Sequence, residues 1–266
     1  MSKGVEIFSL NGKTALITGA AGYLGSAMAF ILAEAGANVL INSRSTERSQ
    51  DLVARLRDQG LQAESAVFDV TSQDAVERFV SSMHGRALHV LVNNAYVGRS
   101  GSIKLSEAGA YSDAYDVTVV AAHRLLKSLL PNLRKAVHLD NDASVINLAS
   151  MYALVSPDQR IYEAESGVNP PFYGAAKAAL LQWTRYAGCE FGKEGIRVNA
   201  ISPGPFPSEE VQRTNPAFIS SLSNKVPMGR IGSAEELRGP TLFLASSASS
   251  FVTGANLVVD GGWTCW

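Results

Sequence analysis

The stretch KTALITGAAGYLG, residues 13–25, decides the fold. Its first six residues form a short apolar run that is rich in β-formers. In residues 22–36 the apolar side chains recur with a helical period. Gly19, Gly22 and Gly25 lie in the turn between these two parts. Glycines at such a turn let the backbone approach phosphate groups and let the helix pack on the strand. The stretch predicts a strand–turn–helix unit that binds a dinucleotide; an ordinary glycine-rich turn is the structural alternative.

The alternation of strand and helix continues to the end of the chain. Further strands are expected at 38–42, 65–70, 89–95, 143–150, 196–202 and 255–262. Helices are expected between them, including 72–84, a long one that ends near Leu130 before Pro131, and 173–192. Strands that are apolar throughout are buried on both faces. We therefore expect a doubly wound α/β Rossmann fold, with one parallel sheet of about seven strands and helices on both faces.

Composition and charge exclude several kinds of partner. The formal net charge of the 266 residues is -1, so no basic field favours nucleic acid or an anionic membrane. No apolar run reaches the ~20 residues of a membrane span, and the start MSKGVEIFSLNGK lacks a signal-peptide core. Cys189, Cys265 and the four scattered histidines have no metal-binding spacing. We expect one cytoplasmic domain over 1–266, without a metal.

The end of the second expected strand indicates which dinucleotide is bound. An acidic residue at this place would accept hydrogen bonds from the ribose of NAD and repel the 2′-phosphate of NADP. The chain instead has the neutral Ser43 and the cationic Arg44, with Arg48 nearby. This pair favours NADP over NAD, which stays possible; a solvated loop arginine is the structural alternative.

PFYGAAK, residues 171–177, contains the candidate catalytic pair. Tyr173 and Lys177 are four residues apart and so share one face of a helix. A free tyrosine has a pKa near ~10, and a neighbouring ammonium lowers that pKa. The small residues between them leave space for ligands. Taken alone, the pair could also be an ordinary pair of side chains on a helix surface.

Several further motifs stand in an order and spacing that resemble a classical short-chain dehydrogenase/reductase over nearly the whole chain. They are TGAAGYLG (18–25), Asp69-Val70, NNA (93–95), INLAS ending in Ser150, YGAAK (173–177), ISPGPF (201–206) and VDGGW (259–263). The resemblance implies cofactor contacts from Gly19, Gly22, Tyr23, Leu24, Gly25, Ser43, Arg44, Asp69, Val70, Asn93, Ala95, Tyr173, Lys177, Pro203, Gly204, Phe206 and Ser208.

The resemblance also implies a mechanism and an assembly. Ser150 would hold the substrate oxygen, Tyr173 would exchange a proton with it, and Lys177 would lower the pKa of Tyr173 and bind the nicotinamide ribose. The reaction would interconvert a secondary alcohol and a ketone by hydride transfer. The family resemblance implies a homotetramer or a dimer.

Three positions depart from the family pattern. Tyr23 stands where the classical turn has glycine, and the resulting spacing resembles the extended branch of the family. Thr118 aligns with the catalytic asparagine of the family, so it either takes a part in the proton relay or only packs in its helix. Tyr96 replaces the glycine of NNAG and adds a ring near the nicotinamide.

The separation of Ser150 and Tyr173 is wider than the family's usual spacing, and an insertion at about 156–171 accounts for it. Its polar groups suit a polyhydroxylated substrate, and Met151, Tyr152, Arg160 and Tyr162 are the candidate substrate contacts. The C-terminal half resembles gluconate 5-dehydrogenase-like members, which fits a sugar, a sugar acid or a cyclitol. The alternatives are a solvated loop for the insertion, and for the protein a 3-oxoacyl thioester reductase or a cofactor-binding scaffold or sensor.

Overall fold

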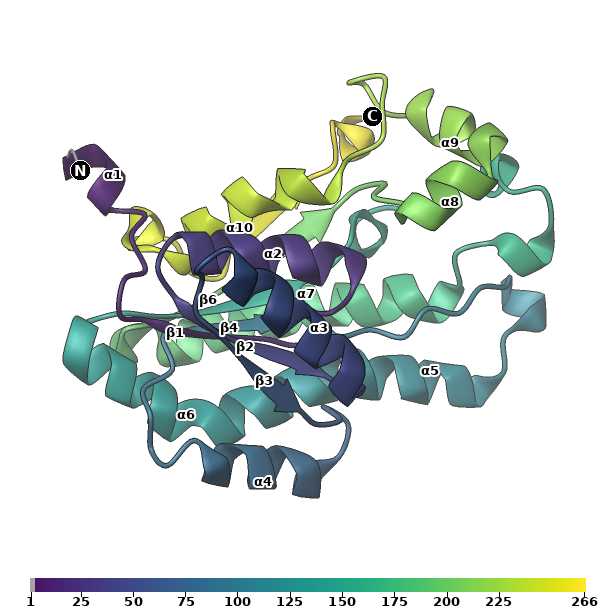
Figure 1. Ribbon diagram of the computed structural model, residues 1–266. Coiled ribbons are helices and arrows are strands. Elements are labelled where there is room, and N and C mark those ends of the chain that lie inside the picture. Colours follow the sequence, from purple (N-terminus) through teal and green to yellow (C-terminus); the bar gives the residue numbers. More distant parts are fainter. Residues whose placement is uncertain (1–2) are drawn as a thin grey trace.

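Seven parallel strands form the centre of the molecule (Figure 1). The computed structural model describes residues 3–266. The strands are β1 (Thr14–Ile17), β2 (Asn38–Ser43), β3 (Ala63–Val67), β4 (Val90–Asn93), β5 (Ala143–Leu148), β6 (Ile196–Pro203) and β7 (Asn256–Val259). They lie in the order β3-β2-β1-β4-β5-β6-β7. This confirms the predicted doubly wound α/β fold with one parallel sheet.

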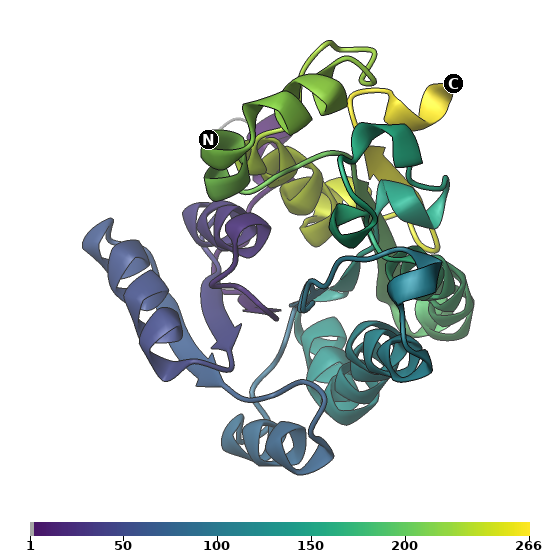
Figure 2. The ribbon, with the colours of Figure 1, turned by 90° about the vertical axis from the view of Figure 1, so that its right-hand side faces the viewer.

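Helices cover both faces of this sheet, as Figure 2 shows with the sheet seen from another side. One face carries α2 (Tyr23–Glu34), α3 (Thr46–Asp58) and α10 (Arg238–Ala245). The other face carries α4 (Gln73–Ser82), α6 (Ala121–Asp140) and α7 (Pro171–Phe191), and α5 (Ala108–Tyr115) packs against α7. The shorter helices are α1 (Lys3–Glu6), α8 (Glu209–Thr214) and α9 (Pro216–Ser223).

Two apolar clusters, one on each face, hold the layers together. Strands β1, β4, β5 and β6 are buried at every residue, as expected for strands covered on both sides. Leu16 and Leu91 face the cluster under α4 and α6, while Ile17 and Val92 face the one under α2 and α10. Each fully buried side chain of this size contributes ~1.5–3 kcal/mol of transfer free energy.

Two expectations about element boundaries are wrong. Pro131 does not end the long helix, because it lies inside α6 on the exposed side. The carbonyl of Lys127, which loses its partner N–H there, is on the same exposed side and can bind water. The third strand ends at Val67 and not at Val70, because its pairing with β2 stops at the Ser43–Val67 pair.

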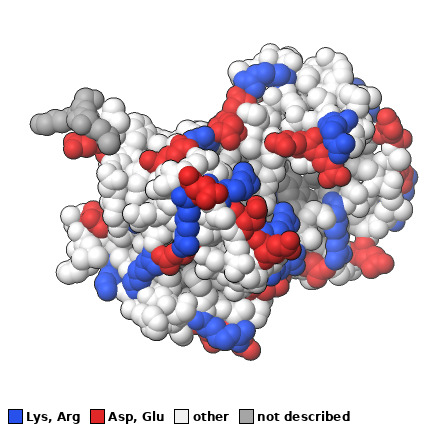
Figure 3. All heavy atoms as spheres, in the orientation of Figure 1, with Lys and Arg blue, Asp and Glu red and all other residues white. Residues whose placement is uncertain are grey.

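The order of the strands places a ligand site at one edge of the sheet. Successive connections run outward from β1 in both directions, so the crevice lies between the carboxyl ends of β1 and β4. Cationic and acidic side chains are interspersed on the face seen in Figure 3. The ion pairs among the described residues include Arg86–Glu64. None of the helices between residues 3 and 266 is long and apolar enough to span a bilayer.

Candidate active site

The turn between β1 and α2 has the geometry of an anion-binding loop. Gly19 has a positive φ of +61°, and a Cβ on Gly25 would lie 2.5 Å from the carbonyl oxygen of Gly19. Glycine is therefore required for the conformation at one position and for close packing at the other. Gly22 is the N-cap residue of α2, so no side chain occupies the N–H groups at the start of this helix. The first turn of α2 has no acidic residue. The N–H groups at this helix end are open to a phosphate.

Three polar residues that the sequence reasoning missed hold this turn. Thr18 Oγ1 accepts hydrogen bonds from the backbone N–H groups of Asn94 (2.9 Å) and Ala95 (3.0 Å). Asn94 Nδ2 donates to the carbonyl oxygens of Thr18 (2.9 Å) and Gly19 (3.1 Å). Asn42 Oδ1 accepts from Gly19 N at 3.3 Å. Two of these residues could have been found from the sequence: Asn94 is the second asparagine of NNA, and Asn42 lies near the end of β2.

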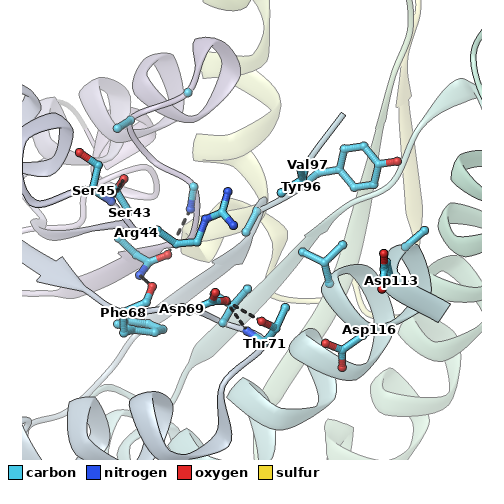
Figure 4. Close-up of a pocket in the computed structure, with 18 of the residues that line it drawn as sticks. Ser43, Arg44, Ser45, Phe68, Asp69, Thr71, Tyr96, Val97, Asp113 and Asp116 are labelled. Carbon is cyan, nitrogen blue, oxygen red and sulfur yellow. Dashed lines mark hydrogen bonds between the residues drawn. The ribbon is translucent and has the colours of Figure 1, made fainter. Parts of the chain in front are cut away.

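A cleft of about 510 Å³ opens beside this turn (Figure 4). Of the expected cofactor contacts, the residues that line it are Gly19, Gly22, Ser43, Arg44, Asp69, Val70 and Ala95. Ser45, Arg48, Phe68, Thr71, Tyr96, Val97 and Arg99 line it as well. Its far end is formed by α5 and its neighbours, through Ala110, Asp113, Ala114, Asp116, Val117 and Phe172.

Asp69 and the arginines make one end of the cleft polar. Asp69 Oδ1 accepts hydrogen bonds from the N–H (2.9 Å) and the hydroxyl (2.7 Å) of Thr71. Burial opposes ionisation of Asp69, but these bonds and the charges of Arg44 and Arg124 outweigh it and lower its pKa. Arg48 Nη2 donates to the carbonyl of Ala21 at 3.1 Å. This end of the cleft thus holds the ionised carboxylate of Asp69 and the guanidinium groups of Arg44 and Arg48.

The three expected catalytic residues come together from β5 and α7. Ser150 follows the carboxyl end of β5, is buried, and accepts a hydrogen bond from Tyr152 N at 3.1 Å. Lys177 is 4% exposed, and its Nζ donates to the carbonyl of Leu148 at 2.5 Å. The same Nζ lies 5.7 Å from the ring centroid of Tyr173. The sheet edge therefore supplies both the serine and the anchor of the lysine.

The electrostatics of this trio differ from expectation. Burial raises the pKa of Tyr173, and the Ser150 hydroxyl only partly offsets this. Burial also lowers the pKa of Lys177 to about 8. The expectation that Lys177 depresses the tyrosine pKa is wrong for the free protein, because the phenol is desolvated while the ammonium is held by Leu148. Tyr173 is therefore a neutral proton donor at neutral pH.

Thr118 lies in a short π-helix, Asp116–Val120, inserted between α5 and α6. Such π-turns are rare and are often found at functional sites. Thr118 is buried, and its Oγ1 has no hydrogen-bond partner among the described residues; the same is true of Asn93 Oδ1. Thr118, Asn93 and Lys177 line one small cavity. Asn93 thus faces this cavity, while its Nδ2 donates to Asn147 Oδ1 at 2.8 Å.

An aromatic cluster surrounds Tyr173. The rings of Tyr96 and Tyr173 meet edge to face, with centroids 4.8 Å apart. Three expected substrate contacts, Met151, Tyr152 and Tyr162, lie in the same cluster as Tyr173, and the hydroxyls of Tyr152 and Tyr162 are 3.2 Å apart. The other members of the cluster are Val155, Ile161, Phe218, Ile219, Leu222, Val226, Ile231 and Trp263.

Some expected contacts lie elsewhere. Tyr23 is absent from the cleft lining, and its hydroxyl accepts from Ala234 N at 3.3 Å and Gln212 Nε2 at 3.4 Å. Arg160 points into solvent with 84% of its side chain exposed and pairs with Asp158, and it is not part of the cluster around Tyr173. Leu24 packs in the apolar cluster under α2, and Ser208 caps α8.

The turn after β6 lies at the same edge of the sheet. A Cβ on Gly204 would lie 2.5 Å from Asp260 Cα, so the Pro203–Gly204 turn packs directly on the C-terminal segment. Phe206 lines a separate pocket with Gly232 and Asp260. Within residues 3–266, no three His, Cys, Asp or Glu side chains gather in a way that could hold a metal ion.

Comparisons with known proteins agree with this geometry. The family model described as Enoyl-(Acyl carrier protein) reductase matches residues 19–264. The chain is 32% identical to gluconate 5-dehydrogenase of Gluconobacter oxydans, over 97% of each chain. It is 31% identical to a rhamnolipid-biosynthesis 3-oxoacyl-[acyl-carrier-protein] reductase of Pseudomonas aeruginosa, over 96% of this chain and 98% of that one.

A solved structure supports the same assignment. The crystal structure of a gluconate 5-dehydrogenase from Burkholderia cenocepacia, in complex with NADP and tartrate, superposes with a TM-score of 0.87. The sequences are 31% identical, and the match covers 99% of both chains. The chain belongs to the short-chain dehydrogenase/reductase family, the nicotinamide-dependent oxidoreductases that act on CH–OH groups.

Proposed function

We propose that the protein interconverts a secondary alcohol and a ketone on a polyhydroxylated small molecule, with NADP(H) as its cofactor. The observation that carries the proposal is the convergence of Ser150, Tyr173 and Lys177 at the carboxyl edge of the sheet. Relatives named as gluconate 5-dehydrogenase and 5-keto-D-gluconate 5-reductase support a sugar, a sugar acid or a cyclitol as substrate.

The residues of the cleft fit NADP. The uncapped end of α2 and the turn at Gly19 and Gly22 suit the pyrophosphate, because they offer backbone N–H groups and no negative charge. Ser43, Arg44 and Arg48 line the cleft where β2 ends and suit a 2′-phosphate. Bound there, NADPH supplies the hydride of the reduction.

The roles of the catalytic residues follow from their positions. Ser150, whose hydroxyl lies near that of Tyr173, would hold the carbonyl oxygen of the substrate. Tyr173, neutral because burial raises its pKa, would donate a proton to that oxygen. Lys177, fixed by the Leu148 carbonyl, would direct its remaining N–H groups to the ribose hydroxyls and supply positive charge as the tyrosine loses its proton.

We also propose that Thr118 takes part in the proton path to Lys177. The unpaired Oγ1 of Thr118, the unpaired Oδ1 of Asn93 and Lys177 border one cavity, and orphan buried polar groups call for an explanation. Thr118→Val removes the hydroxyl but keeps the shape, so kcat should fall while the Kd of NADPH is unchanged. Thr118→Ser should retain activity; equal activity of the valine and serine variants would leave Thr118 a packing residue.

A 3-oxoacyl thioester is the second candidate substrate. The apolar members of the cluster around Tyr173, such as Met151, Phe218 and Trp263, and the similarity to 3-oxoacyl-carrier reductases favour it. The tyrosine hydroxyls in the same cluster favour the polyhydroxylated substrate. The third alternative, a scaffold or sensor without activity, is disfavoured by the intact trio.

The assembly is proposed to be a cytoplasmic homotetramer or dimer. Large apolar side chains are exposed on α5 and α7 and near the C-terminus, among them Tyr115, Tyr186, Phe251 and Trp266. Exposed apolar patches of this kind mark interfaces between subunits. Light scattering coupled to size-exclusion chromatography gives the mass of the assembly directly; a monomer would contradict this proposal.

The function is tested by following NADPH oxidation with a panel of keto sugars, keto sugar acids, inososes and an acetoacetyl thioester. We expect turnover with polyhydroxylated ketones and little with the thioester. A clear preference for the thioester would replace the proposed substrate class by the second one. No turnover with any carbonyl compound, despite NADPH binding, would support the scaffold.

A further inference from the structure

The hydroxyl of Tyr96 has no partner in the free protein. Its oxygen is buried and makes no hydrogen bond to any of the described residues. The ring lies beside both catalytic groups, with its centroid 4.8 Å from that of the Tyr173 ring and 5.4 Å from Lys177 Nζ. In Figure 4 the hydroxyl end of Tyr96 points away from Arg44 and Asp69. The hydroxyl therefore belongs to the substrate side of the site and not to the adenosine end of the cleft.

An unpaired buried hydroxyl costs free energy in the folded protein. The cost is the desolvation of the polar group, and native proteins keep few such groups. Burial, and after it the neighbouring Tyr173, raise the pKa of Tyr96, so the group is a neutral O–H. A neutral phenol is both a donor and an acceptor of hydrogen bonds. A ligand hydroxyl next to Tyr173 would satisfy it.

The remaining polar groups of the cluster around Tyr173 are also neutral. The hydroxyls of Tyr152 and Tyr162 share one hydrogen bond of 3.2 Å, and burial raises the pKa of both residues. The rest of this cluster is apolar, with Met151, Phe218 and Trp263 among its members. The surroundings of Tyr173 therefore combine uncharged hydroxyls with an apolar surface.

The cations on the segments around this cluster are paired with carboxylates or exposed to solvent. The ion pairs on these segments are Arg99–Asp113, Lys104–Glu165, Arg160–Asp158, Lys225–Asp158 and Arg230–Glu236. Arg213 is exposed on α8, and Lys177 is bound to Leu148 within the catalytic trio. A substrate carboxylate in the cluster would be buried without a counter-charge, which is costly.

Building on the proposed function, we infer that the substrate is an uncharged polyhydroxylated ketone or alcohol. The Tyr96 hydroxyl donates a hydrogen bond to one of its hydroxyl groups. The Tyr152–Tyr162 pair offers a second uncharged contact within the cluster around Tyr173. Tyr96 is thus a specificity-determining residue that the usual glycine of NNAG could not replace.

The charge of the substrate is tested with matched pairs of ketones. L-Sorbose and 5-keto-D-gluconate have the same ketone and the same stereocentres, and they differ only in the terminal hydroxymethyl or carboxylate group. We expect kcat/KM with NADPH to favour the neutral member of each such pair by on the order of tenfold or more. An equal or reversed preference overturns the inference while the proposed function stands. Reduction of no ketone at all overturns both.

The role of Tyr96 is tested with Tyr96→Phe, which removes only the hydroxyl. We expect kcat/KM for the neutral substrate to fall about 2- to 12-fold, mainly through KM, as for one lost neutral hydrogen bond. The Kd of NADPH should be unchanged. The Tm of the free variant should stay the same or rise, because the orphan hydroxyl is gone. Tyr186→Phe makes the same change on the exposed side of α7 and should leave kcat/KM and the Kd of NADPH unaltered.

Two results would overturn the assignment of Tyr96. A lower Tm with unchanged kcat/KM would show that the hydroxyl has a structural role. An increase in the Kd of NADPH as large as the increase in KM would place the hydroxyl on the cofactor. Thermal shift and fluorescence titration with NADPH separate both results from the expected one.

Discussion

We expect single residues at the end of β2 to decide which nicotinamide cofactor the cleft accepts. Ser43 provides a hydroxyl, Arg44 provides a charge, and both line the cleft. One charge-assisted contact to a 2′-phosphate contributes ~1.5–3 kcal/mol, or about 10- to 150-fold in affinity. The double variant Ser43→Asp, Arg44→Ala should therefore reverse the preference from NADP to NAD.

The measurement for this prediction is kcat/KM for both cofactors, in the wild type and in the double variant. Arg55→Ala serves as the control, because Arg55 is on α3 and its guanidinium lies over Phe30, 5.6 Å from the ring centroid. A wild-type enzyme that uses NAD and NADP equally well would contradict the role of Arg44.

Lys177 gives the enzyme two opposite responses to pH. Burial lowers its pKa to about 8, below the ~10.4 of an unfolded lysine. Between these values the unfolded chain binds more protons than the folded one, so the contribution of Lys177 makes the free energy of unfolding rise with pH. The reductase activity should instead fall above pH 8, because the charge that holds the ribose and assists Tyr173 is lost.

Both responses can be measured between pH 7 and pH 10. Urea unfolding of the wild type and of Lys177→Met gives the difference in stability, which should shift in favour of the wild type as pH rises. The decline of kcat/KM should have an apparent pKa near 8 and be independent of buffer identity. A flat activity profile up to pH 10 would show that the ammonium is not required in its charged form.

Among the elements, the insertion at about 156–171 is the one that we propose shapes the substrate side. Asp158 accepts hydrogen bonds from Arg160 N (3.0 Å) and Nη2 (2.8 Å), and it pairs with Lys225 beyond the end of α9. Arg160, and then Lys225, hold the pKa of Asp158 well below its usual range. Because the folded pKa is depressed, this anchor is intact at neutral pH and is lost only in strong acid.

Releasing the anchor should weaken substrate binding selectively. Asp158→Asn removes the charge that joins the insertion to the segment after α9, and ion pairs with exposed partners contribute modestly. We expect the KM of the ketone to rise about 2- to 10-fold while the Kd of NADPH stays constant. Glu163→Gln, an exposed carboxylate in the same insertion, is the matched control. Equal effects on ketone and NADPH would indicate a general scaffold role for the insertion.

The elements themselves were predictable to different degrees. The period of apolar residues located all seven strands, because buried parallel strands are apolar throughout. It failed at Pro131, because a proline on the exposed side of a helix leaves its orphan carbonyl to water. It also could not find the π-helix around Thr118, because one extra residue in a helical turn has no distinct hydrophobic pattern.

At the scale of the whole molecule, the sequence described the elements of the site better than the surroundings of the site. The motifs predict that Ser150, Tyr173 and Lys177 meet, and the structure brings them together, because each stands at a fixed point of a strand or helix. The pKa of Tyr173 and the exposed position of Arg160 depend on packing between segments far apart in the chain. Local patterns carry no information on such packing, so the pKa of Tyr173 was predicted in the wrong direction and the exposure of Arg160 was not predicted.

The central claim is that one edge of the sheet binds the cofactor while Tyr173 supplies the proton. The most direct test is Tyr173→Phe, which keeps the ring in its aromatic cluster and removes the proton donor. The rate of NADPH oxidation with the best ketone of the panel should fall about 10²- to 10⁴-fold, with the Kd of NADPH unchanged. A variant that retains a kcat close to that of the wild type would contradict the account.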